Sequence, residues 1–82
     1  MRKYPKHEEN PEINKRWIDI FREYKNNPFL EATFSKIYRH GYCLFHKEED
    51  VIDRVSSILN SHEIPFTKYD EDKIYWKLNL NY

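Results

Sequence analysis

The 82-residue sequence has one glycine, one cysteine and no long apolar run. With a single glycine, it contains neither a glycine-rich phosphate loop nor a dinucleotide-binding fingerprint. Cys43 alone cannot form an internal disulfide, and no secretory leader is visible, which together favour a reducing cytoplasmic setting. No stretch approaches the roughly 18–20 apolar residues that a membrane-spanning helix needs. We therefore expect a cytoplasmic chain with no cofactor and no membrane contact.

The length suits one domain. Residues 1–9 are polar and aperiodic, and we interpret them as a flexible basic arm. Residues 10–82 carry the apolar patterns, so they are expected to form a single compact domain. A chain of this size buries a modest share of its surface, which makes a stabilising partner or a homodimer plausible on physical grounds.

Two Asn-Pro pairs mark helix starts, because asparagine caps a helix and proline suits its first turn. After Asn10-Pro11, an apolar stripe recurs at helical spacing until Asn26-Asn27 ends the helix. The stripe consists of Ile13, Trp17, Ile20, Phe21 and Tyr24.

Residues 28–40 allow two interpretations. In one, Asn27-Pro28 starts a second helix, and Gly41 ends it in the left-handed conformation. In the other, strands at 32–38 and 42–46 form a β-hairpin. The helix is favoured, because in a strand Phe34 and Ile37 would fall on opposite faces.

Residues 42–82 indicate a β-α-β-β block. Residues 42–45 form a short apolar run that predicts a buried strand, and 48–61 predict an amphipathic helix. A hairpin of 64–69 and 73–80 follows, turning at Asp70-Glu71-Asp72. Its second strand alternates strictly, with Ile74, Trp76, Leu78 and Leu80 on one side.

The predicted fold class is therefore α+β: two N-terminal helices, then β-α-β-β with a three-stranded antiparallel sheet. The alternative order is α-β-β-α-β-β, in which residues 28–40 contribute a strand. The predicted core comprises Trp17, Phe21, Phe34, Ile37, Leu44, Val51, Val55, Ile58, Leu59, Phe66, Trp76 and Leu78.

No pattern predicts catalysis firmly. His40, Cys43 and His46 have ligand types that zinc accepts, but in a strand residue 43 points away from the other two. The apolar neighbours of Cys43 indicate an inert thiol. We therefore predict no metal site and no catalytic residue; among enzymes, a nuclease would suit the sequence best.

The charge balances overall but is unevenly distributed. Residues 1–47 carry ten Lys/Arg and six Asp/Glu, whereas residues 48–82 carry four and eight. Basic side chains interleaved with aromatic ones suit phosphates and stacked bases, which makes the N-terminal half a candidate nucleic-acid surface. The candidate residues are Arg2, Lys3, Lys6, Lys15, Arg16, Arg22, Lys25, Lys36 and Arg39.

The run from Asp50 to Leu59, followed by 74–78, resembles the recognition helix and wing of winged-helix regulators. That resemblance implies DNA binding by the helix, yet here the first turn of the helix is Glu48-Glu49-Asp50, which phosphates would repel. The same run is similar to half of a LAGLIDADG homing endonuclease. The acidic metal ligand of that family lies in a glycine-rich context, which Asp19 lacks.

Acidic residues at the start of the third helix and at the hairpin suit contact with a basic protein surface. The candidate protein-interface residues are Glu48, Glu49, Asp53, Tyr69, Asp70, Asp72, Tyr75 and Lys77. The sequence is therefore interpreted as a small non-enzymatic intracellular protein-binding module, a regulator or inhibitor. The alternative is a nucleic-acid-binding, winged-helix-like regulator that uses its basic half. The Lys/Asn/Tyr/Ile bias also suits an AT-rich viral or phage genome.

Overall fold

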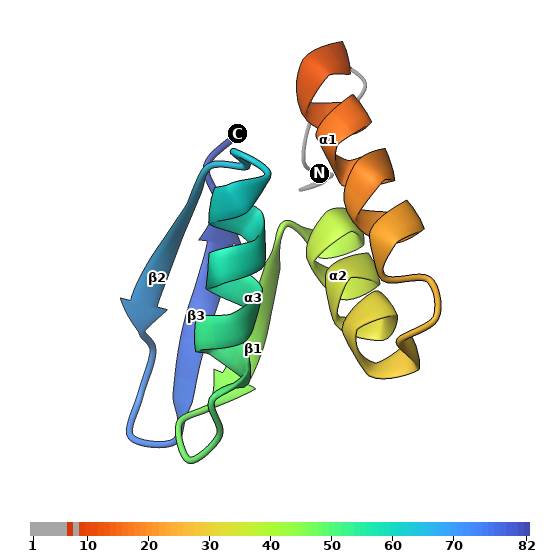
Figure 1. Ribbon diagram of the computed structural model, residues 1–82. Helices are drawn as coiled ribbons and strands as arrows, with labels where there is room; N and C mark the ends of the chain where they lie inside the picture. Colours follow the sequence, from red (N-terminus) through yellow and green to blue (C-terminus); the bar gives the residue numbers. More distant parts are fainter. Residues whose placement is uncertain (1–6, 8) are drawn as a thin grey trace.

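The structure is a computed structural model that describes residue 7 and residues 9–82 (Figure 1). Its elements confirm the predicted α+β order with two N-terminal helices. They are α1 (Pro11–Glu23), α2 (Pro28–His40), β1 (Tyr42–His46), α3 (Val51–Ser61), β2 (Phe66–Asp70) and β3 (Tyr75–Leu80).

The three strands form one antiparallel sheet in the order β1-β3-β2. In Figure 1, α3 lies across the sheet, and α1 and α2 lie on the side of β1. Buried residues of all three helices join Phe45, Leu78 and Leu80 in a single cluster. Because these three strand residues share one side of the sheet, the helices cover that side and leave the other open.

Residues 28–40 are helical, so the hairpin alternative is excluded. The side chain of Asn27 accepts a hydrogen bond from the Leu30 N–H at 3.2 Å, which caps α2. At the other end, Gly41 adopts a left-handed φ of 83°, and its N–H donates to the Ile37 carbonyl at 2.8 Å. Caps at both ends therefore stabilise residues 28–40 as a helix, which is the interpretation that the sequence favoured.

Helix α1 is capped by Asn10, whose side chain accepts from the Ile13 N–H at 3.3 Å. Trp17 lies on the core-facing side of α1 and is fully buried. The helix ends at Glu23, three residues before the predicted Asn26-Asn27 stop.

The predicted flexible arm, residues 1–9, lies mostly outside the described residues. At His7 the prediction does not hold, because this side chain is buried with 6% exposure. Its ring stacks on Tyr38 at 3.9 Å between centroids, and its Nε2 lies 2.9 Å from the Tyr38 carbonyl oxygen. His7 therefore packs against the helix layer, and a polar, aperiodic sequence gave no signal of this.

The strand β1 is not buried as predicted. Only Phe45 is buried, whereas Leu44 is 43% exposed and Tyr42 is 45% exposed. The predicted core position of Leu44 is wrong, because the apolar run predicts burial on both sides of the strand. In the structure the helices cover one side of the sheet alone, so alternate residues of β1 face outward.

Two elements begin later in the chain than the sequence predicts. Helix α3 begins at Val51, so Glu48 and Glu49 lie in the preceding turn and not in its first turn. Strand β3 begins at Tyr75, and Ile74 is 51% exposed at the hairpin.

Most of the predicted core is confirmed. Six predicted residues are buried: Trp17, Phe34, Ile37, Val55, Leu59 and Leu78. Five are partly buried and pack against them: Phe21, Val51, Ile58, Phe66 and Trp76. None of the helices in the described part of the chain is long and apolar enough to cross a bilayer.

Candidate functional site

The side of the sheet opposite the helices is the candidate site, and we call it the open face. Strand pairing defines its members, because Leu44 of β1 and Tyr69 of β2 both pair with Lys77 of β3. Side chains two positions away point the same way. The open face therefore consists of Tyr42, Leu44, His46, Thr67, Tyr69, Tyr75, Lys77 and Asn79.

Large side chains on this face are accessible to solvent. Tyr69 is 47% exposed and Tyr75 is 37% exposed, in addition to Tyr42 and Leu44. Three tyrosines and a leucine thus project from three neighbouring strands of a rigid sheet. A cluster of this kind is informative, since single exposed apolar residues are common but gathered ones mark contact surfaces.

Contacts within the open face hold its side chains in place. The Lys77 ammonium lies 4.9 Å from the centre of the Tyr42 ring, and the His46 and Tyr75 rings meet edge to face at 5.7 Å. Both geometries are favourable for aromatic rings. The Tyr42 and Tyr75 rings therefore have contacts that restrict them before any ligand arrives, which lowers the entropy cost of binding.

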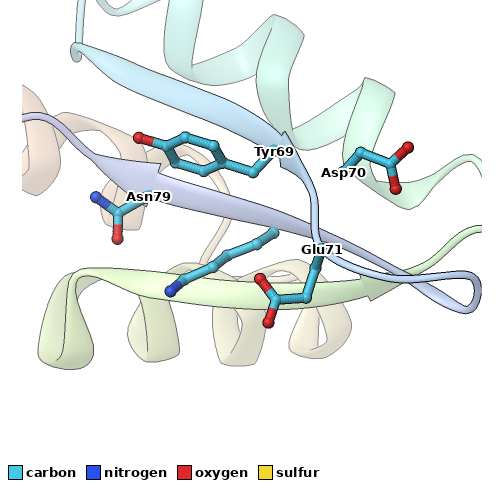
Figure 2. A pocket seen from close by; sticks show the side chains of 5 residues that line it. Tyr69, Asp70, Glu71 and Asn79 are labelled. Atoms are coloured by element: carbon cyan, nitrogen blue, oxygen red, sulfur yellow. The ribbon is translucent and has the colours of Figure 1, made fainter.

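A shallow pocket of about 390 Å³ opens at the β2–β3 hairpin. Tyr69, Lys77 and Asn79 of the open face line it, together with Asp70 and Glu71. Figure 2 shows the Tyr69 and Asn79 side chains extending over one side of the sheet while Asp70 points away from them. The pocket therefore combines an aromatic wall with polar groups of both charges.

The predicted protein-interface residues do not form one surface. Tyr69, Tyr75 and Lys77 lie together on the open face. Asp53 and Asp70 lie on the helix side, where each has its own counterion: Asp53 Oδ1 is 3.5 Å from Lys68 Nζ, and Asp70 bonds to Lys47. Both lysines flank the Trp76 ring.

The remaining predicted acids lie at turns. Glu48 and Glu49 are exposed in the turn before α3. Asp72 accepts hydrogen bonds from the Ile74 and Tyr75 N–H groups, each at 2.8 Å. These two backbone bonds hold the pKa of Asp72 below its usual value. Asp72 thus shapes the hairpin turn, which is a structural role.

The predicted nucleic-acid residues are dispersed. Arg2, Lys3 and Lys6 lie outside the described residues. On α1, Arg16 bonds to the Glu63 carbonyl at 3.0 Å and pairs with Glu12 at 3.5 Å.

The other basic residues of α1 share its surface with carboxylates. Lys15 and Arg22 are exposed there among Asp19 and Glu23, and Lys25 is exposed in the turn that follows the helix. Helix α1 therefore has a mixed polar surface, whereas Lys36 and Arg39 lie on α2.

The structure separates the three residues whose side-chain types zinc accepts. His40 ends α2, Cys43 faces the helix side of the sheet, and His46 belongs to the open face. Among the described residues, no group of three or more His, Cys, Asp or Glu side chains could hold a metal ion. Burial raises the pKa of Cys43, which keeps its thiol protonated.

Sequence reasoning missed five site residues: Tyr42, Leu44, His46, Thr67 and Asn79. Their alternation with Cys43, Phe45 and Leu78 was visible. It could not reveal which residues were exposed, because that depends on which side the helices cover. Comparison of the chain with family models, with curated proteins and with solved structures gave no match.

Proposed function

We propose that the protein is a small non-enzymatic module that binds a partner protein through the open face. The observation that carries this is the exposure of three tyrosines and Leu44 on the uncovered side of the sheet. Tyrosine is enriched at protein interfaces because it supplies a large, stiff surface with a polar tip. A regulator or inhibitor that acts by contact fits this size and composition.

The charge of the open face supports a protein ligand over a nucleic acid. Lys77 is its one lysine, and its ammonium already lies over the Tyr42 ring. Nucleic-acid surfaces gain most of their affinity from several phosphate contacts. Glu71, which borders the pocket beside Lys77, would oppose a phosphate there. A face with few charges instead matches the core of a protein interface.

A photo-crosslinking experiment tests this proposal. A benzophenone amino acid at Leu44 should capture a defined partner in cell extract, whereas the same group at Ile18 should not. Ile18 is a matched control, because it is 48% exposed but lies on α1. Capture at Leu44 should be lost in a Tyr69→Ala/Tyr75→Ala variant and kept in Phe29→Ala. Equal capture from both positions would contradict the proposal.

The alternative, nucleic-acid binding by the basic half, has less support because carboxylates interrupt the basic residues of α1. It predicts binding that weakens steeply between about 50 and 200 mM salt. Charge reversal at Lys15 and Lys25 should then reduce the affinity. Unchanged affinity in that variant would rule this surface out.

A further inference from the structure

The two edges of the sheet differ in a way that bears on binding. Within the described residues, strands β1 and β2 each have one unpaired side, because β3 lies between them. Strand β2 follows Pro65 and contains Lys68 and Asp70, and charges or proline at an edge discourage a further strand from pairing. Strand β1, Tyr-Cys-Leu-Phe-His, contains no Lys, Arg, Asp or Glu. Only the β1 edge therefore lacks these protective features.

The backbone of β1 presents hydrogen-bonding groups along this edge. Leu80 N–H donates to the Gly41 carbonyl and Lys47 N–H donates to the Ile74 carbonyl, each at 2.8 Å. Ladder bonds alternate in an antiparallel pair, so odd-numbered residues from 41 to 47 bond toward β3. The N–H groups of Tyr42, Leu44 and His46 therefore point outward. Their side chains are the β1 members of the open face, so edge and face are continuous.

A second copy of the chain does not fit this edge. Two β1 strands paired about a twofold axis would keep both helix layers on the same side of the joined sheet. Helix α2 of one copy would then lie over β1 of the other, where α2 and α3 already pack. The edge instead suits a single extended segment with no helix above it.

The charges beside the edge indicate the chemistry of that segment. Lys36, Arg39 and His40 are exposed on α2, and none forms an ion pair with another residue of the described chain. The His40 ring lies 6.4 Å from that of Tyr42, which places the basic end of α2 near the start of β1. Glu48 and Glu49 follow the opposite end.

We propose that the β1 edge adds an extended segment of the partner protein as a fourth strand. Acidic side chains of that segment lie against Lys36, Arg39 and His40. Main-chain bonds to Leu44 and its neighbours supply affinity, and alternate side chains extend the open face. This inference rests on the proposed function and specifies how the partner binds.

The test uses a phage-displayed library of random 12-residue peptides, selected on the purified full chain. Selected peptides should be rich in Asp and Glu at one end, with alternating apolar residues. Leu44→Pro removes one outward N–H without breaking a bond to β3, so it should weaken binding at least about tenfold. Leu44→Thr keeps the N–H and is the matched control.

Two further measurements keep the test independent of folding. Two sets of peptides, each methylated on alternate backbone nitrogens, are compared on the unaltered protein. The set whose methyl groups replace the N–H groups facing β1 should lose binding, and the set methylated at the positions between them should keep it. Lys36→Glu/Arg39→Glu should also abolish binding of the acidic peptides. Failure to select peptides, or equal binding of them by the Leu44→Pro variant, would overturn strand addition. Crosslinking at Leu44 would still stand in that case, so the two proposals fail separately.

Discussion

The indole N–H of Trp17 donates a hydrogen bond to the Tyr82 hydroxyl at 2.6 Å, which ties α1 to the end of the β3 segment. Tyr82 also lies 3.1 Å from His7 Nδ1, and His7 Nε2 lies against the Tyr38 carbonyl. Because a carbonyl only accepts, Nε2 carries the proton and Nδ1 accepts from Tyr82. Burial raises the pKa of Tyr82 to about 12, so its hydroxyl remains a donor.

Replacing Tyr82 with phenylalanine should destabilise the protein. The change keeps the ring but leaves the buried Trp17 N–H and His7 Nδ1 without a partner. An unsatisfied buried group costs about 1–3 kcal/mol, so we expect a loss of that size in urea unfolding. Tyr69→Phe is the control, since its hydroxyl is on the open face, and it should change stability by less than about 0.5 kcal/mol. Equal losses in both variants would contradict the role given to Tyr82.

Stability should fall as the solution is acidified through the range of His7. Burial lowers the pKa of His7 below its usual 6.5. Between the folded-state pKa and 6.5 the unfolded chain binds more protons, so the free energy of unfolding rises with pH there and levels off above about 6.5. His7→Phe keeps a ring on Tyr38 and should lose this pH dependence. His40→Phe, at an exposed histidine, should retain it.

Local sequence signals determined much of this fold. Asn27 and Gly41 identified the ends of α2 through short-range backbone chemistry. The alternation of Trp76, Leu78 and Leu80 identified β3 because a strand period is readable within one segment. In each case the physical cause lies within a few residues of the signal.

The open face and the burial of His7 could not be predicted in the same way. Whether Leu44 is core or surface depends on which side α3 covers, and that is decided by packing between distant segments. His7 meets partners 31 and 75 residues away in sequence, at Tyr38 and Tyr82. Its own neighbours contain no pattern that indicates such contacts.

Both caps of α2 should contribute to stability. Asn27→Ala removes the acceptor for the Leu30 N–H and should cost about 0.5–2 kcal/mol. Asn26→Ala is the matched control, because Asn26 is exposed and makes no cap bond. Gly41→Ala places a Cβ at positive φ and should cost about 1–2 kcal/mol. Chemical unfolding followed by circular dichroism measures all three, and an Asn26 effect equal to that of Asn27 would argue against the cap.

Trp76 lies between two lysines, with Lys47 Nζ at 4.8 Å and Lys68 Nζ at 4.7 Å from its ring. Lys68 also pairs with Asp53, but that pair is exposed and should contribute about 0.2–1 kcal/mol that salt screens. The ring contact is partly shielded, since Trp76 packs against the core. The coupling of Lys68 to Trp76 should therefore resist added salt better than its coupling to Asp53.

Double-mutant cycles separate these two interactions. We expect the Lys68→Met/Trp76→Leu cycle to give about 0.5–1 kcal/mol of coupling, most of it retained at 1 M salt. The Lys68→Met/Asp53→Asn cycle should give a smaller value that disappears at that salt concentration. If both couplings disappear at high salt, Trp76 contributes only apolar area, and Lys68 interacts with its surroundings through salt-screened charge alone.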